Sequence, residues 1–230
     1  MTLSRTRRLC QTEEMPRLFQ ELPPIAQKLL LAGERLYGQH GVDGVSLRQI
    51  VAAAGQSNNN AIPLHFMSKR GFIQAISEMR LPPLEKARLV LLDRAHRDDD
   101  LGARRMLRVL LMPLATEMNA HDLEHYSRFT LAVIRVEPEE HPFVKSADIS
   151  PASMEVHQRL QRALSRLPPD VFRRRLALAC NLFLGSASHV GGRLQLTKAG
   201  YRSRQLFFED MFEAALAVLA PPFPPEGWKE

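Results

Sequence analysis

Helical periodicity runs through nearly the whole chain, and it limits the possible folds more than any other feature of the sequence. Apolar residues recur three or four positions apart, which places them on one face of a helix. One such stripe, in residues 25–40, consists of Ile25, Leu29, Ala32 and Leu36. Alternation of apolar and polar residues, which would indicate strands, is scarce. We therefore predict an all-α protein with about nine to ten helices.

A change in helix length divides the chain into three parts. Residues 1–24 end in two prolines and contain little helical pattern, so we expect a flexible N-terminal arm. The basic residues of this arm are Arg5, Arg7 and Arg8. Short helices separated by glycine and serine follow in residues 25–80, and longer ones in residues 81–230. We predict a small helical domain in the first of these segments and a larger one in the second.

The positive charge of the chain is concentrated at its N-terminal end. The net charge is +6, and residues 1–80 hold ten Lys or Arg against six Asp or Glu. Residues 81–230 hold 21 and 19, so their excess per residue is much smaller. A basic segment attracts phosphate groups, although many basic proteins bind no nucleic acid. The charge is thus a weak indication of a nucleic-acid partner.

Cysteine content and apolar runs indicate the compartment. Cys10 and Cys180 are the two cysteines, and a chain of this size without a disulfide framework is typical of a reducing environment. The longest apolar runs are too short to span a bilayer. No apolar segment follows the N-terminal arginines, so they do not indicate a secretory signal. We expect a cytoplasmic protein with no membrane partner.

The segment after the first expected helix carries the signals of a helix-turn-helix. Gly41 and Gly55 are placed to end a first and a second helix, and Ser46 to cap the second. Ser57 can cap a third helix at roughly 58–64. The first two helices would form a small core and hold the third outward, as entry into the major groove requires. The residues expected in that core are Leu29, Leu36, Val45, Leu47, Ile50 and Ala54.

Polar residues that can read DNA occupy this third helix. They include Asn58, Asn59 and Asn60, and an asparagine amide can form a bidentate pair with adenine. The alternative is that three consecutive asparagines simply form a turn. Lys69 and Arg70 begin a fourth helix, where they and its free N–H groups could hold a backbone phosphate.

Residues 25–76 resemble the DNA-binding domain of the TetR family of repressors. The residues that carry the resemblance are Leu36-Tyr37, Gly41, Val45-Ser46-Leu47-Arg48-Gln49-Ile50, Ala53-Ala54-Gly55 and His65-Phe66-Met67-Ser68-Lys69. The resemblance implies a larger, variable helical domain that binds a small molecule and dimerises. We predict that the DNA-binding residues are Ser46, Arg48, Gln56, Ser57, Asn58, Asn59, Asn60, His65, Lys69 and Arg70.

The chain departs from the usual family pattern in its recognition segment. The stretch from Ala54 to Phe66 is one residue longer than in most members, and it resembles an Asn-rich subset. Leu64 stands where a tyrosine is usual, which removes a hydroxyl that could contact phosphate. Pro63 would clash with the preceding turn in a helix interior. Pro63 could be accommodated if the third helix ends or kinks at Ile62.

The region after residue 81 carries no motif for a ligand, so pocket candidates rest on residue type. Apolar side chains could line a cavity, methionine suits adaptable walls, and polar residues on apolar helices could orient a ligand. The candidates are Met106, Leu110, Phe129, Val133, His157, Asn181 and Phe183. The alternative for each is an ordinary core or surface position.

The last expected helix, roughly 203–220, is apolar over more than one face, which its own domain could not fully cover. The resemblance implies that it and the preceding helix pair across a two-fold axis as a four-helix bundle. The interface candidates are Leu184, Ala187, Phe208, Met211, Phe212 and Leu216. The alternative is that the last helix is central in its own domain.

No arrangement of residues indicates catalysis or metal binding. His121 and His125 share a helical face, but a third ligand is not evident, so we expect no metal and no cofactor. Together with the resemblance, this predicts a homodimeric transcriptional repressor, not an enzyme, that binds a near-palindromic double-stranded operator. A small-molecule effector of unknown identity would release it. The alternatives are an all-α enzyme or small-molecule carrier with an incidental helix-turn-helix, and a constitutive DNA-binding protein without a ligand.

Overall fold

The computed structural model describes residues 19–136, 150–190 and 200–220. Within these residues all regular structure is helical, which confirms the predicted all-α class. The elements are η1 (Phe19–Glu21), α1 (Pro24–His40), α2 (Leu47–Ala53), α3 (Ala61–Phe66), α4 (Lys69–Glu78), α5 (Leu81–Arg97), α6 (Ala103–Glu117), α7 (Ala120–Val136), α9 (Pro151–Ala163), α10 (Pro169–Ala187) and α11 (Arg204–Leu219).

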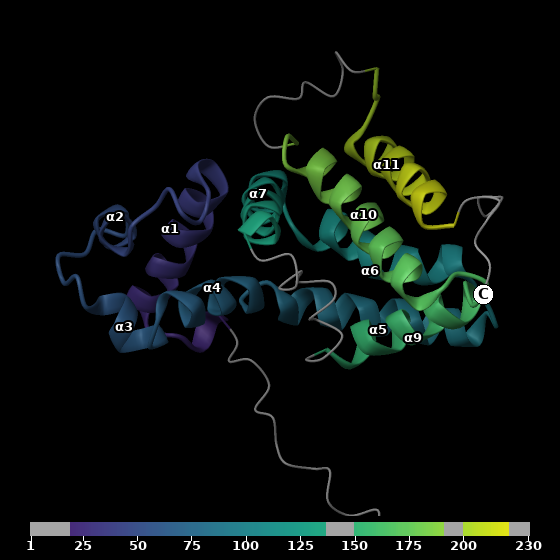
Figure 1. Ribbon diagram of the computed structural model, residues 1–230, viewed down its shortest axis with the longest axis horizontal. Coiled ribbons are helices and arrows are strands. Elements are labelled where there is room, and N and C mark those ends of the chain that lie inside the picture. Colours follow the sequence, from purple (N-terminus) through teal and green to yellow (C-terminus); the bar gives the residue numbers. More distant parts are fainter. Residues whose placement is uncertain (1–18, 137–149, 191–199, 221–230) are drawn as a thin grey trace, which may run out of the picture.

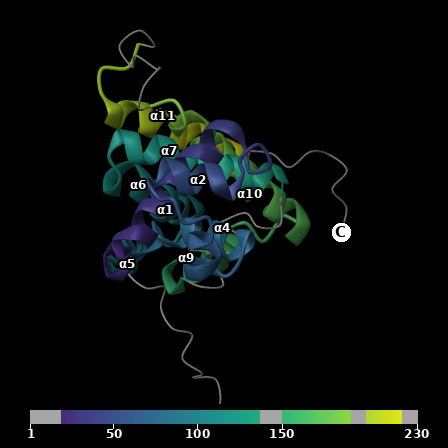
Figure 2. The ribbon, with the colours of Figure 1, turned by 90° about the vertical axis from the view of Figure 1, so that its left-hand side faces the viewer.

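The helices form two groups that lie side by side along the long axis (Figure 1). The smaller group consists of α1–α4 and contains one hydrophobic core, to which α7 adds Phe129 and Val133. The larger group contains a second core, built from α5, α6, α9, α10 and α11 together with the first half of α7. Seen from the N-terminal end, α1 and α2 lie in front of the C-terminal helices (Figure 2).

Two connections hold the groups together. The first is the chain itself, because α5 begins three residues after α4 ends and both lie along one edge of the molecule (Figure 1). The second is the packing of α7 along α1. At Gly38 a Cβ atom would lie 2.9 Å from Cβ of Arg128 and 3.0 Å from the backbone nitrogen of Phe129. Only a glycine allows the two helices to approach this closely.

Local sequence signals explain where several helices begin. Ser46, Ser68, Ser150 and Ser203 each precede a helix, and the side chain of each accepts a backbone N–H bond from its first turn. These bonds satisfy donors that have no partner within the helix. Ser46 also forms a complete capping box with Gln49. The predicted cap at Ser46 is therefore present.

The predicted flexible arm is too long at its C-terminal end. Residues 1–18, which include the three arginines and Cys10, lie outside the described residues. Phe19–Glu21, however, form a short 3-10 helix, and Phe19 and Leu22 pack against the N-terminal core. The amide of Gln27 donates to the carbonyl of Leu22 at 2.8 Å. Apolar contact and this bond fix the segment that the two prolines led us to place in the arm.

Candidate nucleic-acid interface

An aromatic cluster around Tyr37 of α1 holds the smaller group of helices together. The ring of Tyr37 lies 6.3 Å from that of Phe72 on α4 and 6.4 Å from that of Phe129 on α7. Phe66 of α3 lies 5.0 Å from Phe72. A Cβ at Gly33 would fall 2.6 Å from the Phe72 ring. These contacts fix α3 and α4 against α1, so the residues between α2 and α3 are held on a rigid base.

The core predicted for this region is confirmed. Leu29, Val45 and Ile50 are buried, and the other three predicted residues pack against them. Gly55 follows the C-cap residue of α2, Ala54, and its φ is +71°, a left-handed conformation that favours glycine. Arg48 stays exposed on α2, whereas the Gln56 side chain turns back toward the carbonyl of Ala54.

The third helix begins three residues later than predicted. The Asn58 side chain accepts the N–H of Asn60 at 3.0 Å, and the N–H of Ala61 bonds to the Asn58 carbonyl. This turn precedes α3, so the three asparagines do not lie on the helix, and the turn alternative describes their backbone correctly. Ser57 and the asparagines are all exposed, and the Asn60 side chain makes no capping bond. They remain accessible to a partner.

The late start of α3 also explains Pro63. The helix does not end or kink at Ile62 to accommodate Pro63, because it runs from Ala61 to Phe66. Pro63 is its third residue, within the first turn, where a backbone N–H has no partner in the helix anyway. The proline therefore costs no helical hydrogen bond. The sequence signal that could have placed the helix correctly was Pro63 itself.

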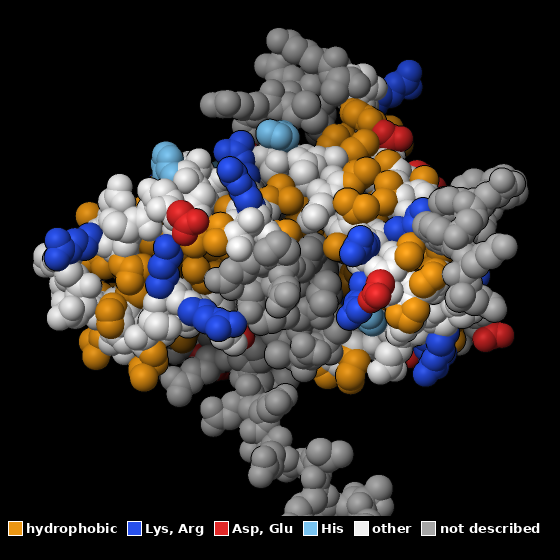
Figure 3. Space-filling model, viewed as in Figure 1, with side chains coloured by type: hydrophobic (Ala, Val, Ile, Leu, Met, Phe, Trp, Pro, Cys, Tyr) orange, Lys and Arg blue, Asp and Glu red, His pale blue; other side chains and the backbone are white. Residues whose placement is uncertain are grey.

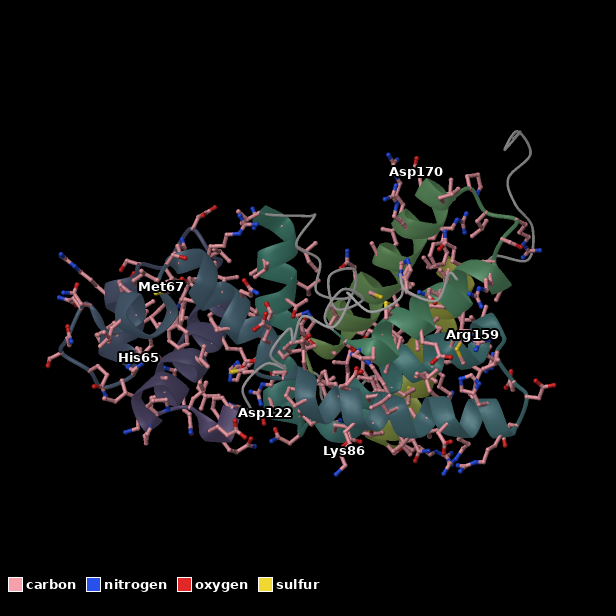
Figure 4. All side chains as sticks on the ribbon, turned by 90° about the horizontal axis from the view of Figure 1, so that it is seen from below. His65, Met67, Lys86, Asp122, Arg159 and Asp170 are labelled. Atoms are coloured by element: carbon pink, nitrogen blue, oxygen red, sulfur yellow. The ribbon has the colours of Figure 1, made fainter. Side chains whose placement is uncertain are left out.

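The outer end of α3 exposes apolar side chains. Leu64 is 73% exposed and Met67 is 86% exposed. Met67 also has φ at +67°, which is unusual for a residue with a side chain. His65 and Met67 lie at the end of the molecule far from Asp170 (Figure 4). Hydrophobic and basic side chains lie near one another on this part of the surface (Figure 3).

The two basic residues at the start of α4 have different environments. Ser68 accepts the N–H of Gly71 at 3.0 Å, and a Cβ at Gly71 would lie 2.3 Å from the Phe66 carbonyl oxygen. The Lys69 ammonium group donates to the carbonyl of Val42 at 2.9 Å and lies 5.9 Å from the centre of the Tyr37 ring. Arg70 is exposed. Lys69 thus ties α4 to the loop before α2, and Arg70 is the more accessible cation.

A buried ion pair lies where the two groups meet. The carboxylate of Glu34, on α1, receives two N–H bonds from Arg80, at 3.1 and 2.8 Å. Arg80 also contacts Asp122, at the start of α7, at 3.3 Å. Burial raises the pKa of Glu34, while the bonds and charge of Arg80 oppose that rise. Glu34 lies between Leu30 and Tyr37 on one helical stripe, so its burial could have been predicted from the spacing.

The residues predicted to line a ligand pocket do not come together. Phe129 and Val133 belong to the N-terminal core, whereas Met106, Leu110 and Phe183 are buried in the C-terminal core. His157 packs its ring against Phe172 at 5.3 Å, and Asn181 is half-buried on α10. The prediction of one shared pocket is therefore wrong, because α7 contributes opposite ends to different cores.

The predicted dimer residues lie mostly inside the protomer. Leu184, Ala187, Phe208 and Phe212 are buried where α10 packs along α11, and Met211 and Leu216 are half-buried. The four buried residues cannot contact a partner without unfolding the protomer, so their assignment is wrong. The alternative, a last helix that is central in its own domain, is correct for the face of α11 that carries Phe208 and Phe212. The outward faces instead carry Leu178, Leu182 and Gly185 on α10 and Leu206, Ala214 and Ala217 on α11.

The C-terminal core encloses a buried arginine. Arg88 is 1% exposed, and its guanidinium donates to Ser153 at 3.0 Å and to the Leu110 carbonyl at 3.2 Å. The Ser153 hydroxyl lies 2.9 Å from that of Ser150, which contacts the carboxylate of Glu85. The backbone N–H of Ala152 also donates to Glu85, at 2.8 Å. Two hydroxyl groups therefore link two opposite charges that do not touch, and they join α5 to the start of α9.

The larger group also contains a groove, of about 960 Å³, between α5, α6 and α11. Its lining includes the apolar side chains of Leu91, Val109, Met112 and Phe208. Several basic residues line it as well. None of the seven predicted pocket residues contributes, so sequence reasoning missed this feature.

The described residues provide no group of three side chains that could hold a metal. His121 and His125 do face each other, with their Nε2 atoms 3.0 Å apart. Cys180 is buried, and burial raises the pKa of its thiol to about 12, so it is protonated and unreactive at neutral pH. No helix among the described residues is long and apolar enough to cross a membrane.

The helix α1, the two short helices α2 and α3, their exposed polar turn and the helical domain behind them have the arrangement of a helix-turn-helix DNA-binding protein. A comparison with protein families gives the same result. The family described as "Bacterial regulatory proteins, tetR family" matches residues 29–76, about a fifth of the chain. Residues 29–76 therefore carry the DNA-binding domain of tetR-type transcriptional regulators, which confirms the resemblance seen in the sequence. No curated protein matches the chain.

Proposed function

We propose that the protein is a dimeric repressor that reads its operator through the exposed turn before α3 and leaves it when a small molecule binds the C-terminal domain. The observation that carries this proposal is the match to the TetR family over the segment that presents Asn58–Asn60 at the surface. The three asparagine amides can pair with base edges, and Arg70 and Arg48 can contact phosphates. The base contacts that recognise the DNA sequence and the phosphate contacts that position the protein on the DNA then come from one end of the molecule.

A second copy of the chain would pack against the outward faces of α10 and α11. Leu178 and Leu206 are both more than half exposed there, and small residues between them allow close approach of helices. A dimer built on this face places two N-terminal domains in successive major grooves of a near-palindromic site. The proposal replaces the buried residues assigned from the sequence with exposed ones on the same two helices.

Release would follow from a change in the spacing of the two N-terminal domains. A ligand that prefers a protomer shape with the wrong spacing shifts the population away from the DNA-binding form. The contacts that could transmit this change are the short connection from α4 to α5 and the packing of α7 along α1.

The test compares the wild-type protein with Asn60→Ala on DNA from upstream of its own gene, by fluorescence anisotropy at fixed salt. Loss of one bidentate base contact should weaken specific binding about 5- to 150-fold, and binding to unrelated DNA should stay the same. Asn60 makes no capping bond, so the variant should fold normally. Gln161→Ala removes an exposed amide on α9 and serves as the control.

Equal affinity of Asn60→Ala and the wild-type protein for the specific site would contradict the role of this residue. Absence of sequence-specific binding by the wild-type protein would contradict the regulator itself. A monomer mass that does not depend on concentration would contradict the dimer.

A further inference from the structure

The groove between α5, α6 and α11 combines an apolar floor with a basic rim. Its floor includes Leu91 on α5, Val109 and Met112 on α6, and Phe208 on α11. Pro113 lies inside α6 and cannot donate a backbone bond to the carbonyl of Val109, so the helix lacks one hydrogen bond beside the groove. A volume of about 960 Å³ is within the range of sites that hold one small molecule.

Positive charges outnumber negative ones among the lining residues. The cations are Lys86, Arg94, Arg105, Arg108 and Arg204, and the anions are Glu117 and Glu209. Arg105 pairs with Asp98, and Arg108 pairs with Glu209. These two pairs leave three cations for which the described part of the chain provides no carboxylate partner. The groove therefore presents a positive charge that its own side chains do not neutralise.

The three remaining cations surround the groove from two of its walls. Lys86 and Arg94 lie two helical turns apart on α5, and Lys86 projects outward from that helix (Figure 4). Arg204 lies on α11, where its guanidinium donates to the carbonyl of Met118 at 2.9 Å and lies 5.4 Å from the centre of the Phe208 ring. Its Nε atom is buried and has no hydrogen-bond partner. A buried donor without a partner is costly, and a turn of the Arg204 side chain toward an anion in the groove would relieve that cost.

We propose that this groove binds a free amphipathic anion, a molecule with an apolar chain and one anionic head group, and that this molecule is the effector. The apolar chain would cover the floor, and the head group would contact Arg204 and the α5 cations. The role as effector rests on the proposed function, whereas binding itself does not. The groove is concave and is shared by three helices, which suits a single molecule better than a flat bilayer surface.

The position of the groove suits a ligand that changes the spacing of a dimer. One wall is α5, which continues from α4 at the DNA-binding end. Another wall is α11, whose opposite face belongs to the proposed dimer surface. A molecule between these walls alters the angle between the element that carries the DNA-binding domain and the element that fixes the two-fold axis.

The test measures binding of dodecanoate to the full chain by isothermal titration calorimetry, at concentrations where the fatty acid does not form micelles. Dodecanol has the same alkyl chain without the charge, and butanoate has the same charge with a much shorter alkyl chain. Dodecyltrimethylammonium carries the opposite charge. We expect dodecanoate to bind one site per chain, and each of the other three to bind at least about tenfold more weakly.

Variants then locate the site. The combination Lys86→Gln, Arg94→Gln and Arg204→Gln should weaken dodecanoate about tenfold or more and leave dodecanol unchanged. Arg97→Gln is the matched control, because Arg97 is an exposed α5 cation outside the groove lining. Val90→Asp places a negative charge on an exposed groove residue and should also weaken the fatty acid, without disturbing the core.

Equal binding of the cationic and anionic amphiphiles, or an unchanged affinity in the triple variant, would overturn the proposal. Binding to anionic phospholipid vesicles without binding of monomeric dodecanoate would overturn the free-molecule assignment. Anisotropy with operator DNA separates the two proposals: dodecanoate binding by a chain that binds no DNA would overturn only the regulator. Binding of both without release would overturn the role as effector.

Discussion

The two cores of the protein bury charge in different ways. In the N-terminal half, Glu34 and Arg80 form a direct two-bond ion pair at the junction of three helices. In the larger group, Arg88 touches no carboxylate among the described residues and is linked to Glu85 through two serine hydroxyls. A direct pair leaves a bare charge when one partner is removed, whereas the serine-linked arrangement leaves each group with other bonds. The same chemical change should therefore cost much more stability at the first site than at the second.

Replacing Arg80 with methionine should produce the largest loss of stability. Glu34 is 2% exposed, so the variant retains a buried carboxylate without its partner, at a cost of about 3–5 kcal/mol in the free energy of unfolding. Urea unfolding at pH 7 measures this loss. Arg97→Met, which removes an exposed partner of Asp93, should cost at most about 1 kcal/mol. An Arg80→Met loss no larger than that of the control would refute the comparison.

The loss in Arg80→Met should depend on pH in a defined direction. Burial raises the pKa of Glu34 above 4.5, and removing Arg80 removes the interactions that oppose this rise. A raised carboxyl pKa means that the folded state binds the proton more tightly than the unfolded state, so stability falls as pH rises through that interval. The stability that Arg80→Met loses relative to the wild-type protein should therefore become smaller as pH falls from 7 toward 4.5. Adding Glu34→Gln should remove this pH dependence.

Replacing Arg88 with methionine should change stability by no more than about 1 kcal/mol. The variant loses two hydrogen bonds, but it also removes the cost of burying an unpaired guanidinium, and the apolar chain fills a similar volume. Glu85 keeps its bonds from Ser150 and Ala152. The same urea titration measures the effect. A loss as large as that of Arg80→Met would show that the serine-linked network behaves as a direct ion pair.

The smallest effect should come from the partly exposed histidine pair on α7. Burial and the neighbouring His121 lower the pKa of His125 below 6.5. The folded state then binds the proton less tightly than the unfolded state, so acidification below about pH 6.5 removes stability. His125→Gln should lose less stability between pH 7 and pH 5 than the wild-type protein does, as thermal unfolding at both pH values would show. An equal loss in both proteins would assign the acid sensitivity to other groups.

The smaller group, α1–α4, was predictable from sequence because its structure depends on signals that act over a few residues. Serine caps, glycine stops and the apolar stripe of α1 each act over a few residues, and they gave the core and the beginning of α2 correctly. The start of α3 was misplaced because Ser57 and Asn60 are both acceptable cap residues. Pro63 favours the later start, since it fits only the first turn of a helix.

The C-terminal half was less predictable because its contacts join distant segments. Phe129 shares an apolar stripe with residues of the other core, and only the crossing of α7 over α1 decides where it packs. The last helix is apolar around most of its surface, so its sequence could not show that Phe208 and Phe212 face inward. Arg88 follows Leu84 and precedes Leu92 on one stripe, which was a readable sign of a buried charge.

The turn before α3 has a consequence for how this protein could acquire a new target. Residues 57–60 are all exposed, and the hydrophobic core resumes only at Ala61. Substitutions in residues 57–60 should therefore change the stability of the domain little, provided that residue 58 still forms the turn. Under the proposed role of this turn in DNA reading, libraries randomised at positions 57, 59 and 60 should yield many folded variants with altered operator preference. Mutational drift in a duplicated gene could follow the same route to a new regulon.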